Sequence, residues 1–337
     1  MLIRFAVDPD AIDADANDLS VSIAVHRRLL KEWRKYGMLV HGFGPLKESA
    51  VFSQVNKLPQ ECRRLWKVAI QNSRRRAASS EWNGYFPNDD LSDLEPFAKD
   101  FDLALLESSR AVVVGGVGIH DSSRIDARLH GLEICKIHSV SESQRFIRAD
   151  EVAKRPLPKG ADCRNEWNER YGEYVEHAAH VVVVDRYIYA NQMRRTIAGE
   201  NSGLDRVLSS CFKRSRERPV NVAILCALQH PGPSVTVAEQ GAIETFVHEL
   251  EKRYCGGGIR SIEFYICTDR DFASHTHERY LRTDYSVFGI DGGIDVFGGD
   301  FSHKGSVVWR HDNAETTRFT LNEAALKLSS FFHKTLL

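Results

Sequence analysis

Long hydrophobic runs are missing from this sequence of 337 residues. Its longest apolar stretches, AAHVVVV and RAVVVGGVGI, are far shorter than the roughly 18 to 20 residues that a membrane-spanning helix needs. The first residues, MLIRFAVDPDAIDAD, carry acidic side chains where a secretory signal peptide has its apolar run. We therefore expect a cytoplasmic protein without a membrane span.

Paired cysteines and a one-sided charge are missing as well. The seven cysteines are scattered without any C-x-x-C pair, which argues against a disulfide framework and against a zinc knuckle. The net charge of -1 excludes a uniformly basic coat for nucleic acid. Local basic runs such as RRLLKEWRKYG and NSRRRAASS are typical of solvated helix faces.

What the sequence does contain is the composition of a packed protein, with 42% hydrophobic and 27% charged residues. Because single domains average roughly 150 residues, the length predicts two of them. The segment RPLPKGADCRNEWN has the proline, glycine and charge of a linker. We place the domains at residues 1–157 and 158–337.

Both halves alternate between predicted helices and strands, which indicates the α/β class. In the first half, a strand at 2–7, a helix at 19–37 and a strand at 38–42 predict a small parallel sheet. The valines at 112–114 read as a further buried strand preceded by a helix. In the second half, strands at 179–189, 220–228 and 259–268 predict a largely parallel sheet, completed by antiparallel strands with glycine turns.

Acidic residues fall at predicted strand ends in the first half. They are Asp8, Glu48, Asp102 and Asp121. Carboxylates gathered at the carboxyl edge of a parallel sheet can hold Mg²⁺ or Mn²⁺ and activate water. The order resembles that of PIN-like ribonuclease domains, and the resemblance implies a metal site on these four residues. A plain turn around Pro9 is the alternative for Asp8.

The second half contains the spacing H-x-R-x-x-x-x-D. Strand alternation puts His277 and Arg279 on one face, where imidazole and guanidinium can converge on a phosphate, and Asp284 could orient the imidazole. The motif resembles the H-x-K-x-x-x-x-D of phospholipase D, with arginine for lysine. Residues 165–312 resemble more closely the phospholipase-D-like carboxy-terminal domain of MIT-domain-containing proteins. A half-exposed pair on a strand is the structural alternative.

Four residues are expected to contact a phosphate: Arg186, Arg279, Gly292 and Gly293. Arg186 follows the VVVV strand, where ligands bind in α/β sheets, and the glycine turns would let backbone amides approach the anion. Active phospholipase D enzymes combine two motifs and this chain has one. The resemblance therefore implies either a homodimer with catalytic His277, Arg279 and Asp284, or a pocket that binds phosphate without cutting it.

These observations predict a phosphodiesterase or nuclease acting on nucleic acid, in a prokaryotic defence or nucleic-acid-processing system with an operon-encoded protein partner. The second domain would need no cofactor. The alternative is a non-catalytic module that binds phosphate and recruits or senses a partner.

Overall fold

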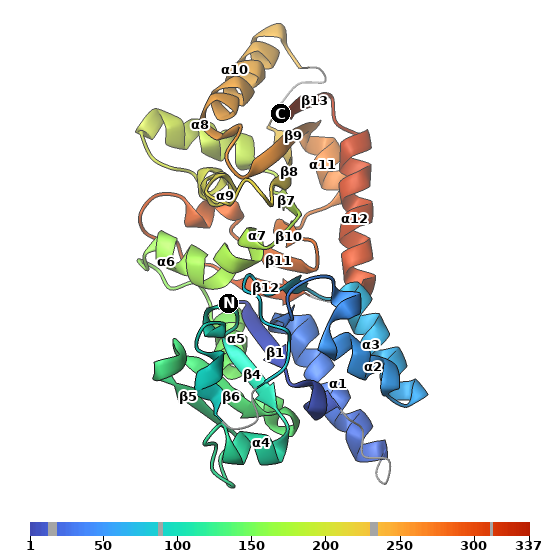
Figure 1. The fold of residues 1–337 in the computed structure, drawn as a ribbon. Coiled ribbons are helices and arrows are strands. Elements are labelled where there is room, and N and C mark those ends of the chain that lie inside the picture. The colour runs from blue at the N-terminus through green and yellow to red at the C-terminus, as the bar shows by residue number, and fades with distance from the viewer. Residues whose placement is uncertain (13–18, 87–89, 230–234, 311–312) are drawn as a thin grey trace. The chain divides into compact units, whose positions relative to one another are not determined.

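The computed structural model describes residues 1–12, 19–86, 90–229, 235–310 and 313–337. It divides into two compact units, residues 2–151 and residues 152–337 together with Met1 (Figure 1). Both units combine a sheet with helices, so the predicted α/β class is confirmed. Within the described ranges, no helix combines the length and hydrophobicity that crossing a membrane requires.

The N-terminal unit has a six-stranded sheet in the order β3-β2-β1-β4-β6-β5. All neighbouring strands are parallel except β5 and β6, as the sequence predicted for a small parallel sheet. The strands are β1 (Ile3–Val7), β2 (Gly37–His41), β3 (Arg75–Ala77), β4 (Leu103–Leu106), β5 (Ser123–Asp126) and β6 (Leu132–Lys136). The helices are α1 (Leu19–Tyr36), α2 (Ala50–Lys57), α3 (Gln60–Asn72), α4 (Ser108–Val113) and α5 (Gln144–Lys154).

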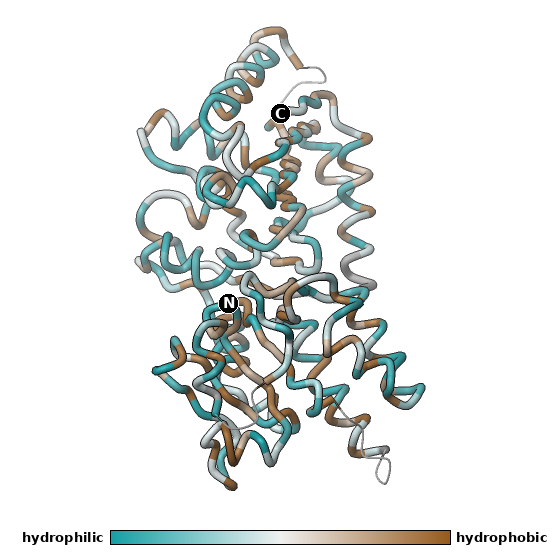
Figure 2. Tube along the Cα trace, in the orientation of Figure 1, coloured by the Kyte–Doolittle hydropathy of each residue, from teal (hydrophilic) through white to brown (hydrophobic). Residues whose placement is uncertain are grey.

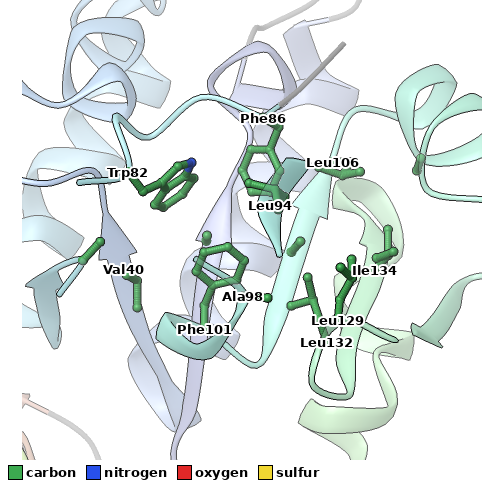
Figure 3. Close-up of a cluster of buried hydrophobic side chains, with 14 of the residues drawn as sticks. Val40, Trp82, Phe86, Leu94, Ala98, Phe101, Leu106, Leu129, Leu132 and Ile134 are labelled. Atoms are coloured by element: carbon green, nitrogen blue, oxygen red, sulfur yellow. The ribbon is translucent and has the colours of Figure 1, made fainter. Parts of the chain in front are cut away.

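One face of this sheet is covered by residues of the segments 78–86 and 90–101, although the sequence at 79–93 predicts a polar loop. Trp82, Phe86 and Phe101 pack there against Val40 of β2 and Leu106 of β4 (Figure 3). The opposite face packs its aromatic residues against the helices, with Phe5 of β1 contacting Trp33 and Phe146. Apolar burial on both faces explains why the central strands are almost wholly hydrophobic.

One pair of predicted elements is reversed. Leu103–Leu106, expected as helix, is the buried strand β4, whereas Val112 and Val113, expected as strand, lie in α4. The Glu107 side chain accepts hydrogen bonds from the amides of Ser109 and Arg110, which caps this helix. Val113 is 79% exposed, so the valine run does not form the continuous buried strand that its composition suggested.

The C-terminal unit has a seven-stranded sheet in the order β12-β11-β10-β7-β8-β9-β13. Strands β7, β8 and β9 are parallel, and antiparallel strands extend the sheet on both sides. The strands are β7 (His180–Val184), β8 (Val220–Leu228), β9 (Ile259–Thr268), β10 (Tyr280–Thr283), β11 (Ser286–Ile290), β12 (Val307–Arg310) and β13 (Phe332–Leu336).

Helices cover both faces of this second sheet. They are α6 (Cys163–Trp167), the π-helical turn η7 (Asn168–Gly172), α7 (Glu173–Glu176), α8 (Ile188–Ala198), α9 (Gly203–Phe212), α10 (Val237–Tyr254), α11 (Asp269–His275) and α12 (Asn313–Leu328). Hydrophobic residues concentrate along the central strands and alternate with hydrophilic ones along α12 (Figure 2). Phe272 of α11 and Phe319 of α12 pack on the Val184 face of β7. The carboxyl ends of β7, β8 and β9 lie at one edge, where α/β sheets bind ligands.

Candidate functional site

Each unit ends a central parallel strand with a buried aspartate. Asp8 directly follows β1 and Asp185 directly follows β7, and each residue is 1% exposed. Buried carboxylates are costly unless they are paired or hydrogen-bonded, so their partners show what each sheet edge can do. We describe the N-terminal edge first.

Asp8 forms an ion pair with an arginine of α4, the helix that follows the neighbouring strand β4. Arg110, in α4 after β4, places Nη1 3.1 Å from Asp8 Oδ2 and Nη2 3.0 Å from Asp10 Oδ2. Asp8 Oδ1 accepts a hydrogen bond from the Asp10 amide. Among the described residues, Oδ2 accepts no well-aligned hydrogen bond. Burial raises the pKa of Asp8 to about 6, although Arg110 opposes the shift.

Two further polar residues lie on the segment that follows β4. Burial raises the pKa of Glu107, but hydrogen bonds from Ser109 and Arg110 outweigh burial and hold the pKa below its usual range. The Ser108 hydroxyl lies 2.9 Å from Nδ1 of His138, which follows β6. The carboxyl edge of the first sheet thus combines carboxylates, one arginine and a hydroxyl–imidazole pair. Of these groups, only Asp8 was predicted as a site residue.

The structure does not bring the four predicted metal ligands together. Asp102 precedes β4 and therefore lies at its amino end, where it binds the Arg4 guanidinium through both oxygens at 3.0 and 2.6 Å. Glu48 is exposed in the short helix η2 (Leu46–Glu48), and Asp121 is exposed in the loop between α4 and β5. The expectation for Asp102 fails because the apolar strand beside it starts immediately after this residue, not at the valine run.

A metal ion fits this predicted set poorly for a second reason. Arg110 already supplies the positive charge that Asp8 and Asp10 face. In the part of the chain that the structure describes, no group of three or more His, Cys, Asp or Glu side chains is arranged to hold a metal. The metal site stays a prediction; among the predicted ligands, the buried Asp8 is paired with Arg110 and Asp102 with Arg4.

Asp185, at the second edge, is held by backbone amides. Its Oδ1 accepts a hydrogen bond from the Tyr187 amide at 3.0 Å, and its Oδ2 accepts one from the Ile294 amide at 2.8 Å. Burial raises the pKa of Asp185, while these two amides and the charge of Arg279 act in the opposite direction. Both carboxylate oxygens thus have donors, and Asp185 ties β7 to the glycine-rich segment after β11.

The glycine turns serve this tie and not a phosphate. Gly293 has φ of +74°, and a Cβ at this position would lie 2.2 Å from Asp185 Oδ2. The Gly293 amide donates to Ile290 O. A Cβ at Gly292 would lie 2.3 Å from Val296 Cγ1. The prediction that both glycines approach an anion is therefore wrong for Gly293, because its amide is used and a carboxylate lies against it.

Arg279 lies beside Asp185 at this edge. Its guanidinium lies 5.4 Å from the centre of the Tyr187 ring and is close enough to Asp185 to lower that residue's pKa. Among the described residues, the guanidinium has neither an ion-pair partner nor a hydrogen-bond acceptor. Arg186, by contrast, binds both oxygens of Asp269 at the start of α11. Of the two predicted phosphate-binding arginines, Arg279 alone has its donors available.

The predicted triad of His277, Arg279 and Asp284 is split between the two ends of a strand. β10 begins at Tyr280, so His277 and Arg279 precede it, and they lie at its start rather than alternating along it. Asp284 follows β10 and accepts hydrogen bonds from the amides of Ala179 and His180, where β7 begins. Because β10 runs antiparallel to β7, Asp284 lies at the opposite edge of the sheet and does not orient His277.

His277 itself is exposed. Within the described residues its imidazole has no hydrogen-bond or ion-pair partner, so a ligand at the Arg279 edge could meet both side chains. Tyr187 completes this group and was missed as an individual site residue, although the sequence places it two residues after the strand-ending aspartate. We use the name Arg279 edge for Asp185, Tyr187, His277 and Arg279.

Comparisons with known proteins identify no family for this chain, so the proposal of a function depends on the geometry described above. No family model matches the chain, and no curated protein sequence matches it. Among solved structures, the chain matches TrmBL2, described as an archaeal chromatin protein with a novel mode of DNA binding. The TM-score is 0.25 and the identity 11%, over 57% of this chain and 62% of the TrmBL2 chain. A TM-score this low shows no shared fold and carries no argument about function.

Proposed function

We propose that this protein binds the phosphodiester backbone of nucleic acid at the Arg279 edge. The observation that carries the proposal is the Arg279 guanidinium, which is half-buried over Tyr187 and has no acceptor among the described residues. A guanidinium offers five N–H donors in a planar arrangement that matches two phosphate oxygens. A phosphate at this position would supply the acceptors that the protein does not.

The groups around Arg279 leave its guanidinium available to an anionic ligand. The carboxylate of Asp185 is close enough to interact with Arg279, but its two oxygens accept hydrogen bonds from backbone amides. Tyr187 presents a half-buried ring beside the guanidinium, and aromatic rings at such sites stack on bases of single strands. His277 adds an exposed donor two residues before Arg279. Together these groups favour binding of a strand over cleavage, because none of the described carboxylates is hydrogen-bonded to His277.

The test is the affinity of the full chain for fluorescently labelled single-stranded and double-stranded RNA and DNA, measured by anisotropy. We expect Arg279→Gln to weaken binding by about tenfold or more, since a charged hydrogen bond is worth about 1.5 to 3 kcal/mol. The slope of log affinity against log salt should fall by about 0.9 for duplex, as for one lost phosphate contact. Arg279→Lys should recover part of the affinity.

Arg260→Gln is the matched control, because Arg260 is an exposed arginine of β9 with no partner among the described residues. Equal affinities for Arg279→Gln and Arg260→Gln would overturn the assignment. Binding of a phosphorylated protein but of no nucleic acid would replace it by recruitment of a partner.

We also propose that the protein acts in a prokaryotic defence or nucleic-acid-processing system, together with an operon-encoded partner.

Asp8, Asp10 and Arg110 form a group at the carboxyl edge of the first sheet, which we name the Asp8 edge. Hydrolysis of nucleic acid at the Asp8 edge is a second candidate function. The observation that favours it is the buried Asp8 carboxylate beside Arg110 and Asp10 at the carboxyl end of β1, where burial raises the pKa of Asp8 to about 6. Cleavage that Asp8→Asn abolishes and Arg279→Gln does not would place the activity at the N-terminal edge. Repeating the assay with EDTA, then with Mg²⁺ or Mn²⁺ added back, decides whether a metal takes part.

A catalytic role for His277 would need a second copy of its motif, and a symmetric dimer would supply one. Light scattering of the purified chain measures this directly. Loss of cleavage in His277→Ala together with a dimeric mass would favour catalysis at the Arg279 edge. A monomer that binds nucleic acid would favour the binding function.

A further inference from the structure

The C-terminal unit contains a cavity that lies outside the Arg279 edge. It has a volume of about 610 Å³ and lies between the segment formed by α6, η7 and α7 on one side and α9 with the residues after it on the other. None of the four residues of the Arg279 edge lines it. Ligand pockets for small molecules have volumes of roughly 300 to 1,000 Å³, so the cavity is large enough for one such ligand.

One wall of the cavity is cationic. Arg206, Lys213 and Arg214 line it from α9 and the turn that follows, together with Ser209 and Ser210. Asp205 lines the same wall, but its carboxylate oxygens accept hydrogen bonds from Gln192 and Tyr254. The Ser210 hydroxyl is also used, since it donates to Arg206 O and accepts from Trp167 Nε1. This wall therefore presents a net positive charge to the cavity.

The donors of this wall are only partly used within the protein. Arg206 donates from Nη2 to Gly299 O, but its Nε is buried and has no acceptor among the described residues. Lys213 is exposed and has no partner in the described ranges. Arg214 donates to Ala178 O at 2.6 Å, and burial lowers the pKa of its guanidinium. Because the Arg206 Nε is sealed from solvent, the exposed Lys213 ammonium is the clearest donor that this wall offers to a ligand.

The opposite wall is acidic and contains the π-helical turn. Glu173 and Glu176 of α7 line the cavity, next to Asn168 and Gly172 at the two ends of η7. A π-helical turn inside a helix is rare and is found mostly at functional sites. Gly172 leaves this part of the wall without a side chain. Arg164 of α6 also lines this side, so the cavity has a net positive charge on one side and two carboxylates with one arginine on the other.

We infer that the cavity binds a mononucleotide. Its phosphate would take the donors of Arg206, Lys213 and Ser209, because guanidinium, ammonium and hydroxyl groups are the common phosphate ligands in proteins. Its base would face α7, where carboxylate oxygens accept hydrogen bonds from ring and exocyclic N–H groups. A mainly cationic wall that faces the two carboxylates of α7 fits a ligand with an anionic end and a donor-bearing end, and it fits inorganic phosphate less well.

Calorimetric titration of the full chain with AMP, GMP, CMP and UMP tests the inference, with inorganic phosphate and the nucleosides as partial ligands. We expect one nucleotide to bind more tightly than either of its parts. Lys213→Gln should weaken its binding by about tenfold, and Glu176→Gln should weaken the nucleotide and the nucleoside alike. Thermal unfolding of each variant shows whether the fold is retained.

Two controls separate this site from the rest of the protein. Lys304→Gln changes another exposed lysine of the same unit, outside the cavity, and should leave the titration unchanged. Arg279→Gln should do the same, so the inference can fail or hold independently of the proposed function. No binding by any of the four nucleotides would overturn it. So would equal affinities in the wild type and Lys213→Gln, or a loss of binding only in Arg279→Gln.

Discussion

The two strand-ending aspartates, Asp8 and Asp185, are equally buried and have opposite environments. Asp185 receives one backbone amide on each oxygen and anchors the glycine turn at Gly293. Asp8 has one amide on Oδ1, and its other oxygen faces Arg110 as an ion pair. A carboxylate whose oxygens are both held by the backbone is part of the fold. One that retains an oxygen without an aligned donor can exchange protons or ligands, so equal burial does not indicate an equal role.

The largest effect is expected from removing the structural member of the pair. Asp185→Ala leaves the buried amides of Tyr187 and Ile294 without acceptors, at about 1 to 3 kcal/mol each. We expect the free energy of unfolding to fall by about 4 kcal/mol, measured by urea denaturation. Hydrogen exchange should localise the change to the residues around Tyr187 and Ile294. Unchanged protection there would show that the anchor role is wrong.

The next effect is the pH dependence of stability that Asp8 contributes. Its pKa is raised, so its contribution to stability is fully present below the unfolded pKa of about 4 and is lost as the pH rises through about 6. As the pH rises from about 4 to about 7, the unfolding free energy of the wild type should therefore fall by about 3 kcal/mol relative to that of Asp8→Asn. Denaturation at several pH values measures it. A difference that is flat with pH would contradict the raised pKa.

A smaller effect tests the ion pair at the Asp8 edge. Arg110 lowers the pKa of Asp8, so Arg110→Gln should raise that pKa above about 6. The shift should be about one unit, as for loss of a nearby opposite charge. It is read from the pH at which the same stability difference levels off. Arg124→Gln is a control, because Arg124 belongs to the same unit but pairs with Asp126.

The smallest effect on stability is expected at the cation that we assign to ligand binding. Arg279→Gln removes a contact over the Tyr187 ring and no ion pair within the described residues. The unfolding free energy should therefore change by about 0.5 to 1 kcal/mol, the usual value of an exposed cation–π contact. A loss near that of Asp185→Ala would show that Arg279 is structural and would count against the proposed phosphate site.

The sequence predicted most of the strands because their residues are buried on both faces. The strands Ile3–Val7, His180–Val184 and Val220–Leu228 are mostly apolar, and each lies within a predicted strand. The strand predicted at 179–189 ends earlier, because Ile188 and Tyr189 belong to α8. The failures lie where local pattern and tertiary burial disagree. Val112 and Val113 have strong β-propensity but lie in a helix capped by Glu107.

The same distinction applies to the site residues. The sequence could identify Asp8 and Asp185 as strand ends, because a buried strand that stops at an aspartate puts the carboxylate at the edge of a sheet. It could not show that Asp102 lies at the other end of its strand, since that depends on where β4 begins. Nor could the H-x-R-x-x-x-x-D spacing show that β10 runs from Tyr280 to Thr283, which separates Asp284 from Arg279 by the length of a strand.

By itself the sequence determined the α/β class, the order of the central strands along the chain and the positions of their terminal aspartates. These depend on apolar runs and turns that are local in the chain. Only the tertiary structure decided the partners. Arg110 faces Asp8 from a neighbouring strand's helix, Ile294 reaches Asp185 across 109 residues, and Arg279 keeps its donors free. Which charges and amides pair depends on where the groups lie in space. A shift of one residue along a strand changes those positions and therefore the partners.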